Sequence, residues 1–415
     1  MYIRRYMFVV REQGIKAMSE NIKKVFQDHL EEKKFAGVNM SVRKDGKEIF
    51  RYKNGLRDVD NNLPVEYDTI FRLASMTKPV VAVAALILSD RKQLGLDDEI
   101  AKYIPAFSHM QAADRLVGFM DIYEADPENP MIPRYRPEKL DGIKLIPAKY
   151  PITIRDILGH CSGMGHGPYS CMLYEKGLRP EQTLEERVNW IAEVPLDFQP
   201  GTHTGYSASV AFEVLGRIVE IVSGKDLDTF VQDEICMPIG IKDLGYQLDN
   251  RQISRISRVY EAKDGRLKDV TETDAFWKIV NPLMNGYYSG SAGMFGSLEA
   301  YDRFAAMLAG GGAFDGVRIL KEETVKRIGT NSSDRHLMME PGIGWGLGMI
   351  VHENTEASGR KVSVGSFGWS GAYGTHFFVD PVKRISAVMM MSVSNIGGAN
   401  SPIAKVFENC VEEMY

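Results

Sequence analysis

Two residues at the start of an apolar stretch have the types and the spacing that nucleophilic chemistry needs. Ser75 and Lys78 lie three positions apart in "FRLASMTKPVVAVAALIL", residues 71–88. On a helix, these positions share one face with Cβ atoms about 5–6 Å apart, so the amine can reach the hydroxyl. Burial favours a neutral amine that accepts a proton, and a helix N-terminus stabilises a developing oxyanion. The pair is therefore a candidate nucleophile and base.

The S-x-x-K spacing is a weak signal by itself, because the chain contains it elsewhere. Further copies are Ser41/Lys44, Ser89/Lys92 and Ser358/Lys361. The first lies in a predicted hairpin strand, where positions three apart face opposite sides of the sheet. The second lies at the charged end of a helix and the third in a polar turn. Only Ser75 begins a helix that is apolar along its length, and its alternative interpretation is a helix cap beside a lysine that reaches solvent.

The elements that must position this pair are helices in the middle of the chain and strands at its ends. Two alternating runs within residues 38–52 are joined at Asp45-Gly46, a strong signal for a hairpin. From residue 345 onward the pattern is again β. Apolar spacing predicts helices over residues 18–33, from Met76 to near Gly95, over 152–160, over 207–225 with Gly224 at the end, and near 402–413.

This distribution predicts an α+β fold. A largely antiparallel sheet forms from the N- and C-terminal segments, is flanked by helices, and carries an inserted, mostly helical domain. We expect residues 1–74 and 286–415 to form the sheet domain and residues 75–285 the helical domain, with the active site in the cleft between them. Residues 105–150 contain six prolines, and we expect a long irregular loop there that acts as a lid.

Composition and charge exclude several classes of protein. The 415 residues carry a net charge of −5 without a basic cluster, which disfavours nucleic acid and anionic membrane as partners. The four cysteines are too sparse for a disulfide framework and fit a reducing cytoplasm. The apolar part of "MYIRRYMFVVREQG" is too short for a signal peptide, and no stretch is long enough to span a bilayer. We therefore expect a cytoplasmic protein that acts on a small molecule.

The sequence gives no support for a cofactor or a metal. Its histidines are scattered, without the spacing of metal ligands. The glycines at 290–296 and 310–312 lack the strand-glycine-helix order of a nucleotide-binding loop and are expected to form turns. His160 is expected to be a structural histidine. The oligomeric state stays open.

Five segments, in order along the chain, resemble those of the serine β-lactamase-like hydrolases, in the branch of class C β-lactamases and family VIII carboxylesterases. They are "FRLASMTKP", "ITIRDILGHCSG", "QPGTHTGYSAS", "GSAGMFGS" and "GWSGAYGTHFFVDP". The resemblance extends from about Phe35 to the C-terminus. It implies a β-lactamase/transpeptidase-like fold and a reaction that passes through an acyl-enzyme on serine.

The resemblance also implies roles for individual residues. Ser75 resembles the acylated nucleophile and Lys78 its helix partner. Tyr206 stands where the family has the tyrosine of its Tyr-x-Asn motif, which implies that it takes the proton of Ser75 and returns it to the leaving group. Trp369-Ser370-Gly371 stands in place of Lys-Thr-Gly and is expected to bind substrate. The backbone N–H groups of Ser75 and Ala372 are the implied oxyanion hole.

Two departures from the family's pattern change the expected substrate. Ala208, expected at the substrate-binding surface, replaces the asparagine of the tyrosine motif, and Trp369 replaces the lysine that helps to hold a substrate carboxylate. A pocket lined by aromatic residues fits a small neutral ester. The leading hypothesis is therefore a serine carboxylesterase with additional acyltransferase ability.

Other interpretations stay open. A β-lactamase or a D-amino-acid peptidase is the alternative enzyme, and a non-catalytic or singly acylating sensor is the second alternative. Taken singly, Tyr206 is equally a packing tyrosine and Trp369 a core residue. An α/β-hydrolase is disfavoured because no intact G-x-S-x-G occurs in the chain.

Overall fold

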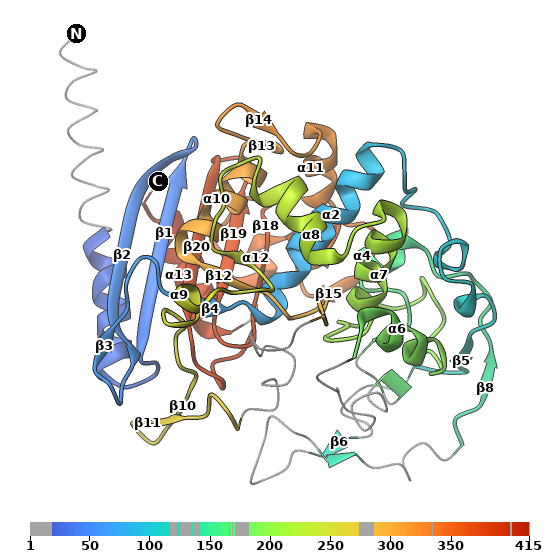
Figure 1. The fold of residues 1–415 in the computed structure, drawn as a ribbon, viewed down its shortest axis with the longest axis horizontal. Helices are drawn as coiled ribbons and strands as arrows, with labels where there is room; N and C mark the ends of the chain where they lie inside the picture. The colour runs from blue at the N-terminus through green and yellow to red at the C-terminus, as the bar shows by residue number, and fades with distance from the viewer. Residues whose placement is uncertain are drawn as a thin grey trace.

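The computed structural model describes residues 19–116, 123–124, 134–135, 142–165, 167, 169–170, 182–273, 286–333, 335–398 and 401–414. Its largest element is a nine-stranded sheet in the order β15-β16-β17-β18-β19-β20-β1-β2-β3. All neighbouring strands in this sheet run antiparallel. Figure 1 shows the N-terminal strands, in blue, beside the C-terminal strands, in red. The predicted α+β fold, with a sheet built from both ends of the chain, is confirmed.

The strands of this sheet are short except in its middle. Their bounds are β1 Gly37–Lys44, β2 Lys47–Asp58, β3 Leu63–Pro64, β15 Met338–Glu340, β16 Ile343–Trp345, β17 Ile350–His352, β18 Phe367–Ser370, β19 His376–Asp380 and β20 Ile385–Met391. The smaller ladders are β4 Ile70–Arg72 with β12 Phe295–Ser297 and β9 Leu244–Gly245, β5 Gln111–Ala113 with β8 Leu145–Pro147, β6 Tyr123–Glu124 with β7 Arg134–Tyr135, β10 Tyr260–Lys263 with β11 Arg266–Asp269, and β13 Ala313–Phe314 with β14 Val317–Arg318.

Helices lie on both faces of the sheet. Many of them belong to the part of the sequence between the N-terminal and the C-terminal strands. Residues 19–31 are helical. Further α-helices among the described residues are α2 Thr77–Asp90, α4 Ile154–Leu158, α6 Leu184–Ala192, α7 Ala211–Ser223, α8 Leu227–Val231, α9 Asn250–Ile253, α10 Leu298–Ala309, α11 Glu322–Ile328, α12 Thr355–Ser358 and α13 Pro402–Glu412. Shorter helical turns are η1 Ala74–Met76, η2 Ile100–Lys102, η3 Pro105–Phe107 and the π-helix η5 Gln232–Cys236.

The two halves of the sheet meet where β1 pairs with β20, with Met40 opposite Met389. The predicted hairpin is present, because β1 turns into β2 at Asp45 and Gly46, which have φ angles of 50° and 76°. These left-handed values are those that a two-residue hairpin turn requires. The hairpin thus brings the N-terminal strands against the C-terminal ones without a long connection.

Each face of the sheet has its own apolar layer. On one face, the helix 19–31 and α13 pack through Phe26 and Phe407 on residues of β1 and β20 such as Met40 and Met389. On the other face, α10 joins a larger core that includes α2 and α7. Burial of these side chains stabilises the fold at roughly 25 cal/mol per Å² of apolar surface. The helical segment therefore packs on one face of the sheet.

Helix α2 is buried from Thr77 to Leu88, as its lack of a polar face predicts. The helix ends at Asp90, however, several residues before the predicted end near Gly95. Lys92 adopts a left-handed φ of 60°, and a left-handed residue just beyond a helix terminates it. The prediction for α7 is confirmed, since Gly224 caps it with a φ of 71°.

The expectation of an irregular loop over residues 105–150 is wrong for part of that segment. The described residues include η3, the ladder of β5 with β8 and the ladder of β6 with β7. Strands of two or three residues are too short to show a period in the sequence, which is why the pattern missed them. Residues 117–122, 125–133 and 136–141 lie outside the described residues, and the function of the segment as a lid stays a prediction.

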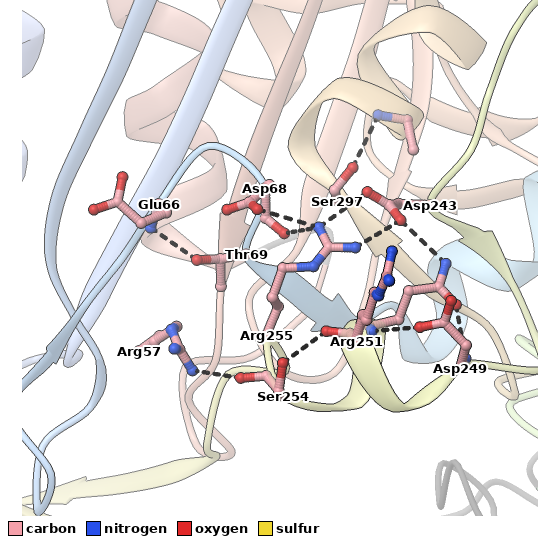
Figure 2. Close-up of polar contacts among 12 residues, drawn as sticks. Arg57, Glu66, Asp68, Thr69, Asp243, Asp249, Arg251, Ser254, Arg255 and Ser297 are labelled. Atoms are coloured by element: carbon pink, nitrogen blue, oxygen red, sulfur yellow. Dashed lines mark hydrogen bonds and ion pairs between the residues drawn. The ribbon is translucent and has the colours of Figure 1, made fainter.

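An ion-pair cluster ties the end of the helical segment to the N-terminal strands. The guanidinium of Arg255 donates to both carboxylate oxygens of Asp243, at 2.9 and 3.1 Å, and to the carbonyl of Asp68 at 2.7 Å. Figure 2 shows Arg255 between these two aspartates, and Arg57 donating to the carbonyl of Ser254. The cluster holds α9 beside β4, which leads directly to Ser75.

The proposed domain boundaries, 1–74 with 286–415 and 75–285, stay a prediction, since one apolar core joins residues of both parts. In the part of the chain that the structure describes, no helix is both long enough and apolar enough to cross a membrane.

Candidate active site

Ser75 lies at a sharp corner between a strand and a helix. β4 pairs with β12, the N–H of Leu73 donates to the carbonyl of Met294 at 3.0 Å, and η1 then leads into α2. Ala74, immediately before Ser75, has a φ of 45°. This left-handed value is strained for a residue with a Cβ, and such strain is found where structure around it fixes a functional geometry. The corner leaves Ser75 half-buried at the start of the helix.

The amine of Lys78 is completely buried and has three oxygen neighbours. It donates to the carbonyl of Ala208 at 2.6 Å and to the carbonyl of Ser291 at 2.9 Å, and it lies 3.3 Å from the hydroxyl of Ser75. The expected contact between Ser75 and Lys78 is therefore present. The alternative in which the lysine reaches solvent is wrong, because the side chain turns inward.

Burial lowers the pKa of Lys78 to about 7, although the charge of Glu213 opposes this shift. An ordinary lysine is fully protonated at neutral pH. A lysine with a pKa near 7 is neutral in about half of the molecules there, so it can accept a proton. The site thus holds an amine that is suited to activate a serine.

Tyr206 reaches the same serine from a distant part of the sequence. Its phenol donates to the hydroxyl of Ser75 at 2.7 Å, and its ring centroid lies 5.1 Å from the amine of Lys78. Because hydroxyl groups donate and accept, the proton between the two oxygens can lie on either one. The structure therefore brings together all three residues that the sequence proposed as catalytic.

His160 holds the loop that carries Tyr206. Its carbonyl accepts the N–H of Gly205 at 2.8 Å, and its Nδ1 lies 3.1 Å from the N–H of Ser207. Burial, with a further effect of the charge on Lys78, holds the pKa of His160 well below its usual value. A neutral ring is needed for Nδ1 to accept a hydrogen bond. These contacts agree with the structural function expected of this histidine.

Aromatic rings from two strands of the sheet, β16 and β18, pack against Tyr206. Tyr206 stacks on Trp345, with ring centroids 5.8 Å apart and planes 7° apart, and lies 4.9 Å from Trp369. The two tryptophans are 4.8 Å apart, and His160 lies 4.1 Å from Trp345. Such clusters contribute roughly 0.5–1.5 kcal/mol per pair beyond the area they bury. They hold the phenol of Tyr206 rigidly against Ser75.

The turn after β18 approaches the backbone next to Ser75 very closely. A Cβ on Gly371 would lie 2.2 Å from the carbonyl oxygen of Leu73 and 2.2 Å from Oγ1 of Thr375. Only glycine fits at this position. Gly371 donates to the carbonyl of Thr375 at 2.7 Å, and Ala372 packs on a small cluster that contains Ala74. The turn thus places Ala372 beside the corner of Ser75, while its function in an oxyanion hole stays a prediction.

Ser370 faces away from the aromatic cluster. Neighbouring residues of a strand point to opposite sides of a sheet, and Trp369 occupies the side of Tyr206. The hydroxyl of Ser370 is buried and lies 2.6 Å from Nδ1 of His376, whose Nε2 lies 3.0 Å from Glu408. Glu408 also binds Arg360. A substrate contact of the Ser370 hydroxyl stays a prediction.

Burial disfavours the charge on Glu408, but the hydrogen bond and charge of His376, with Arg360 and His352, lower its pKa to about 2. The carboxylate therefore stays ionised at neutral pH and is paired with a cation inside the protein. This network joins α13 to β18 and β19 behind the proposed site. It supports the strand that carries Trp369.

The sequence did not indicate two residues around Lys78, Ser291 and Glu213, or Trp345, which packs on Tyr206. Ser291 lies in "GSAGMFGS", which resembles a segment of the family but indicates no function for any single residue. Trp345 lies between two glycines at the start of a predicted strand, which gives no signal of its own. Glu213 is an acidic residue inside an apolar helix, and that exception to the pattern is the signal that could have found it. Ala208, expected at the substrate-binding surface, contributes its carbonyl to Lys78 instead of a side chain.

The fold and the serine-centred site define a serine hydrolase of the superfamily that includes β-lactamases and penicillin-binding proteins. The family model described as Beta-lactamase matches residues 22–401, and this chain belongs to that family.

Relatives within this family differ in the activity that their names state. Esterase EstB of Burkholderia gladioli is 26% identical, over 95% of this chain and 95% of its own length. A putative D-alanyl-D-alanine carboxypeptidase of Escherichia coli strain K12 is 27% identical, over 90% of this chain and 81% of its own length. The solved structure of EstCE1, titled a hydrolase with promiscuous acyltransferase activity, has a TM-score of 0.75 at 21% identity and covers 98% of this chain and 100% of that chain.

Proposed function

We propose that this serine hydrolase is a carboxylesterase that acts on small neutral esters through an acyl-enzyme and can also transfer the acyl group to an alcohol. The observation that carries the proposal is the position of Trp369. Trp369 is 6% exposed and its ring centroid lies 4.9 Å from that of Tyr206, where the β-lactamases that this chain resembles have a lysine. An indole offers a flat apolar surface to an acyl group and no charge to a carboxylate.

The proposed acylation uses Ser75, Lys78 and Tyr206. Lys78 and Tyr206 both contact the Ser75 hydroxyl, at 3.3 and 2.7 Å, and we treat them as a pair that exchanges one proton with it. Above about pH 7 the amine of Lys78 is neutral. Tyr206 and Lys78 together then accept the proton of Ser75 as the Ser75 oxygen bonds to the ester carbonyl carbon. The N–H groups of Ser75 and Ala372 bind the oxyanion. The pair then returns the proton to the leaving alcohol.

Deacylation reverses these steps with water or an alcohol as the nucleophile. The pair removes a proton from that nucleophile, and Ser75 recovers one when the new ester or acid leaves. The alcohol competes with water, so its concentration decides between transfer and hydrolysis. The names of EstB and EstCE1 support an esterase and an acyltransferase, respectively.

The test is hydrolysis of short-chain p-nitrophenyl esters by the wild type and by Ser75→Ala. Ser89→Ala is the matched control, because Ser89 belongs to another S-x-x-K copy and lies near the other end of the same helix α2. We expect Ser75→Ala to lose at least about 10³-fold in kcat/KM and the control to keep its rate. Equal rates for Ser75→Ala and wild type would exclude Ser75 as the nucleophile.

A second candidate function is hydrolysis of β-lactams or D-alanyl peptides. It is favoured by the similarity to a putative D-alanyl-D-alanine carboxypeptidase. Turnover of nitrocefin or of a D-alanyl-D-alanine peptide that far exceeds ester turnover would select this candidate. A fluorophosphonate probe that labels Ser75 once, without ester turnover, would instead select a singly acylating sensor.

A further inference from the structure

Glu213 is a buried acidic residue that the proposed reaction does not use. It lies in the first turn of α7, is 1% exposed, and has apolar neighbours in the helix on both sides. Within the described part of the chain, Glu213 forms no ion pair with a lysine or arginine. A carboxylate is costly to bury without partners, so its presence here calls for a physical explanation.

Four donors from one short segment surround the carboxylate. Oε1 accepts the Ser289 hydroxyl at 2.5 Å and the N–H of Ser291 at 3.1 Å. Oε2 accepts the Tyr287 phenol at 3.0 Å and the N–H of Gly290 at 3.2 Å. Hydrogen bonds to a charged acceptor are stronger than those between neutral groups. Glu213 therefore determines the path of residues 287–291.

The segment 287–291 is pressed directly onto α7. A Cβ on Gly290 would lie 2.0 Å from the carbonyl oxygen of Phe212, so the backbones approach more closely than any side chain allows. This approach places the carbonyl of Ser291 2.9 Å from the amine of Lys78. The path from Glu213 to Lys78 thus passes through one residue, whose N–H binds the carboxylate and whose carbonyl binds the amine.

We infer that Glu213 is a positioning residue of the hydrolase site, which holds the carbonyl of Ser291 against Lys78 and acts on that amine through its negative charge. The inference depends on the proposed function, since it concerns the same Ser75, Lys78 and Tyr206. Glu213 does not touch the Ser75 hydroxyl and takes no part in bond formation. It keeps the amine of Lys78 in place while that amine exchanges a proton.

The charge of Glu213 changes the pKa of Lys78 in a direction that can be measured. Burial lowers the pKa of Lys78 to about 7, and Glu213 raises it. Removal of the charge must therefore lower the pKa of Lys78 further. The other titratable groups that face Lys78 or Glu213 from the surrounding elements are Tyr206, His160, Tyr246 and Tyr287. The charge of Arg187 acts on Tyr287.

If Glu213 only supports the fold, its charge should not affect the pH dependence of the reaction. If it also acts on Lys78 through its charge, removal of that charge should shift the pH midpoint. Glu213→Gln keeps the shape and removes the charge, and its amide nitrogen faces at least one of the two backbone N–H donors. Glu213→Asp keeps the charge but is one methylene too short to reach all four donors. Glu220→Gln is the matched control, because Glu220 lies two turns further along α7 and binds Arg217 and the N–H of Leu227.

The experiment measures kcat/KM for a p-nitrophenyl ester from pH 5 to 9, with Ser75→Ala in the same series. We expect kcat/KM to rise with pH through about 7 in the wild type and in Glu220→Gln. For Glu213→Gln we expect a plateau about 10- to 100-fold lower and a midpoint lower by at least about half a pH unit. For Glu213→Asp we expect the lower plateau with a midpoint close to that of the wild type.

The inference is overturned if Glu213→Gln keeps the wild-type midpoint, whether or not its plateau falls. If Glu213→Gln does not fold, Tyr287→Phe replaces it, because loss of one donor to the Glu213 carboxylate changes the charge that acts on Lys78 and must shift the midpoint. An unchanged profile for Tyr287→Phe would then overturn the inference. Ester activity that persists in Ser75→Ala would instead refute the proposed function, so the two failures are distinguishable.

Discussion

The phenol of Tyr206 donates a hydrogen bond of 2.7 Å to the hydroxyl of Ser75, although 131 positions separate the two residues. This contact joins the loop before α7 to the corner before α2, and Lys78 contacts the same hydroxyl at 3.3 Å. One hydroxyl with two proton-exchanging neighbours is the arrangement that acyl transfer requires. Substitutions in this arrangement, and in the parts of the fold that hold it, should therefore change ester hydrolysis or stability.

Loss of the Tyr206 phenol should stop proton transfer without unfolding the site. Tyr206→Phe keeps the ring that packs on Trp345 and Trp369, so we expect its thermal unfolding midpoint to stay near that of the wild type. We expect kcat/KM for a short-chain ester to fall by about 10²–10⁴. Tyr150→Phe is the control, because Tyr150 is 49% exposed. A variant with both its rate and its stability intact would remove Tyr206 from the mechanism.

The buried amine of Lys78 should make stability depend on pH in a predictable direction. Its pKa is about 7 in the folded protein against 10.5 as the ordinary value. Between these values the unfolded chain binds more protons than the folded protein, so stability must rise with pH across this window. Below about pH 7 both states bind the proton, and the cost of burying the charge is constant.

Denaturant unfolding of the wild type and of Lys78→Met measures this effect, because the variant lacks the titrating group. We expect the unfolding free energy of the wild type minus that of the variant to increase from pH 7 to pH 9, with a slope that approaches about 1.4 kcal/mol per pH unit. A difference that does not change with pH would show that the amine is solvated and has an ordinary pKa.

A methyl group on Gly371 should displace the turn that carries Ala372. Gly371→Ala would bring a Cβ to 2.2 Å from the carbonyl oxygen of Leu73, and neither backbone can move without shifting the corner of Ser75. We expect a loss of about 1–3 kcal/mol in stability and of about 10²-fold in ester kcat/KM. Gly398→Ala is the control, since a Cβ there has no atom within 4 Å. Equal activity in the two variants would contradict the close approach.

The charge of Glu408 should stabilise the support behind β18. Glu408→Gln leaves the buried Arg360 without its carboxylate, and we expect a loss of about 3–5 kcal/mol in the free energy of unfolding. Glu413→Gln is the control, because Glu413 pairs with Lys361 near the surface, and we expect it to change stability by less than about 0.5 kcal/mol.

The pH dependence of the same network has a definite sign. The pKa of Glu408 is about 2 in the folded protein against an ordinary 4.5. A lowered folded pKa gives stability that is present above about pH 4.5 and is lost as the pH falls toward 2. Acid unfolding that is identical in the wild type and in Glu408→Gln would contradict this assignment.

The local elements could be predicted because each depends on residues that are close together in the chain. The Asp45-Gly46 turn, the buried helix that follows Ser75 and the glycine that ends α7 all follow from spacing, backbone freedom and hydrophobic period. The same local geometry predicts that Lys78 reaches Ser75, since they are three positions apart on one helix. The predicted end of α2, near Gly95, was wrong because Lys92 adopts a left-handed conformation that a sequence pattern does not reveal.

Only the tertiary structure decided which distant groups surround that pair. The sequence by itself determined the sheet from both chain ends, the S-x-x-K pair and the order of the motifs. The inward turn of Lys78 to the carbonyls of Ala208 and Ser291, and the direction of the Ser370 hydroxyl toward His376, depend on how separate segments pack. Packing is cooperative across the whole core, so no single stretch of residues encodes it.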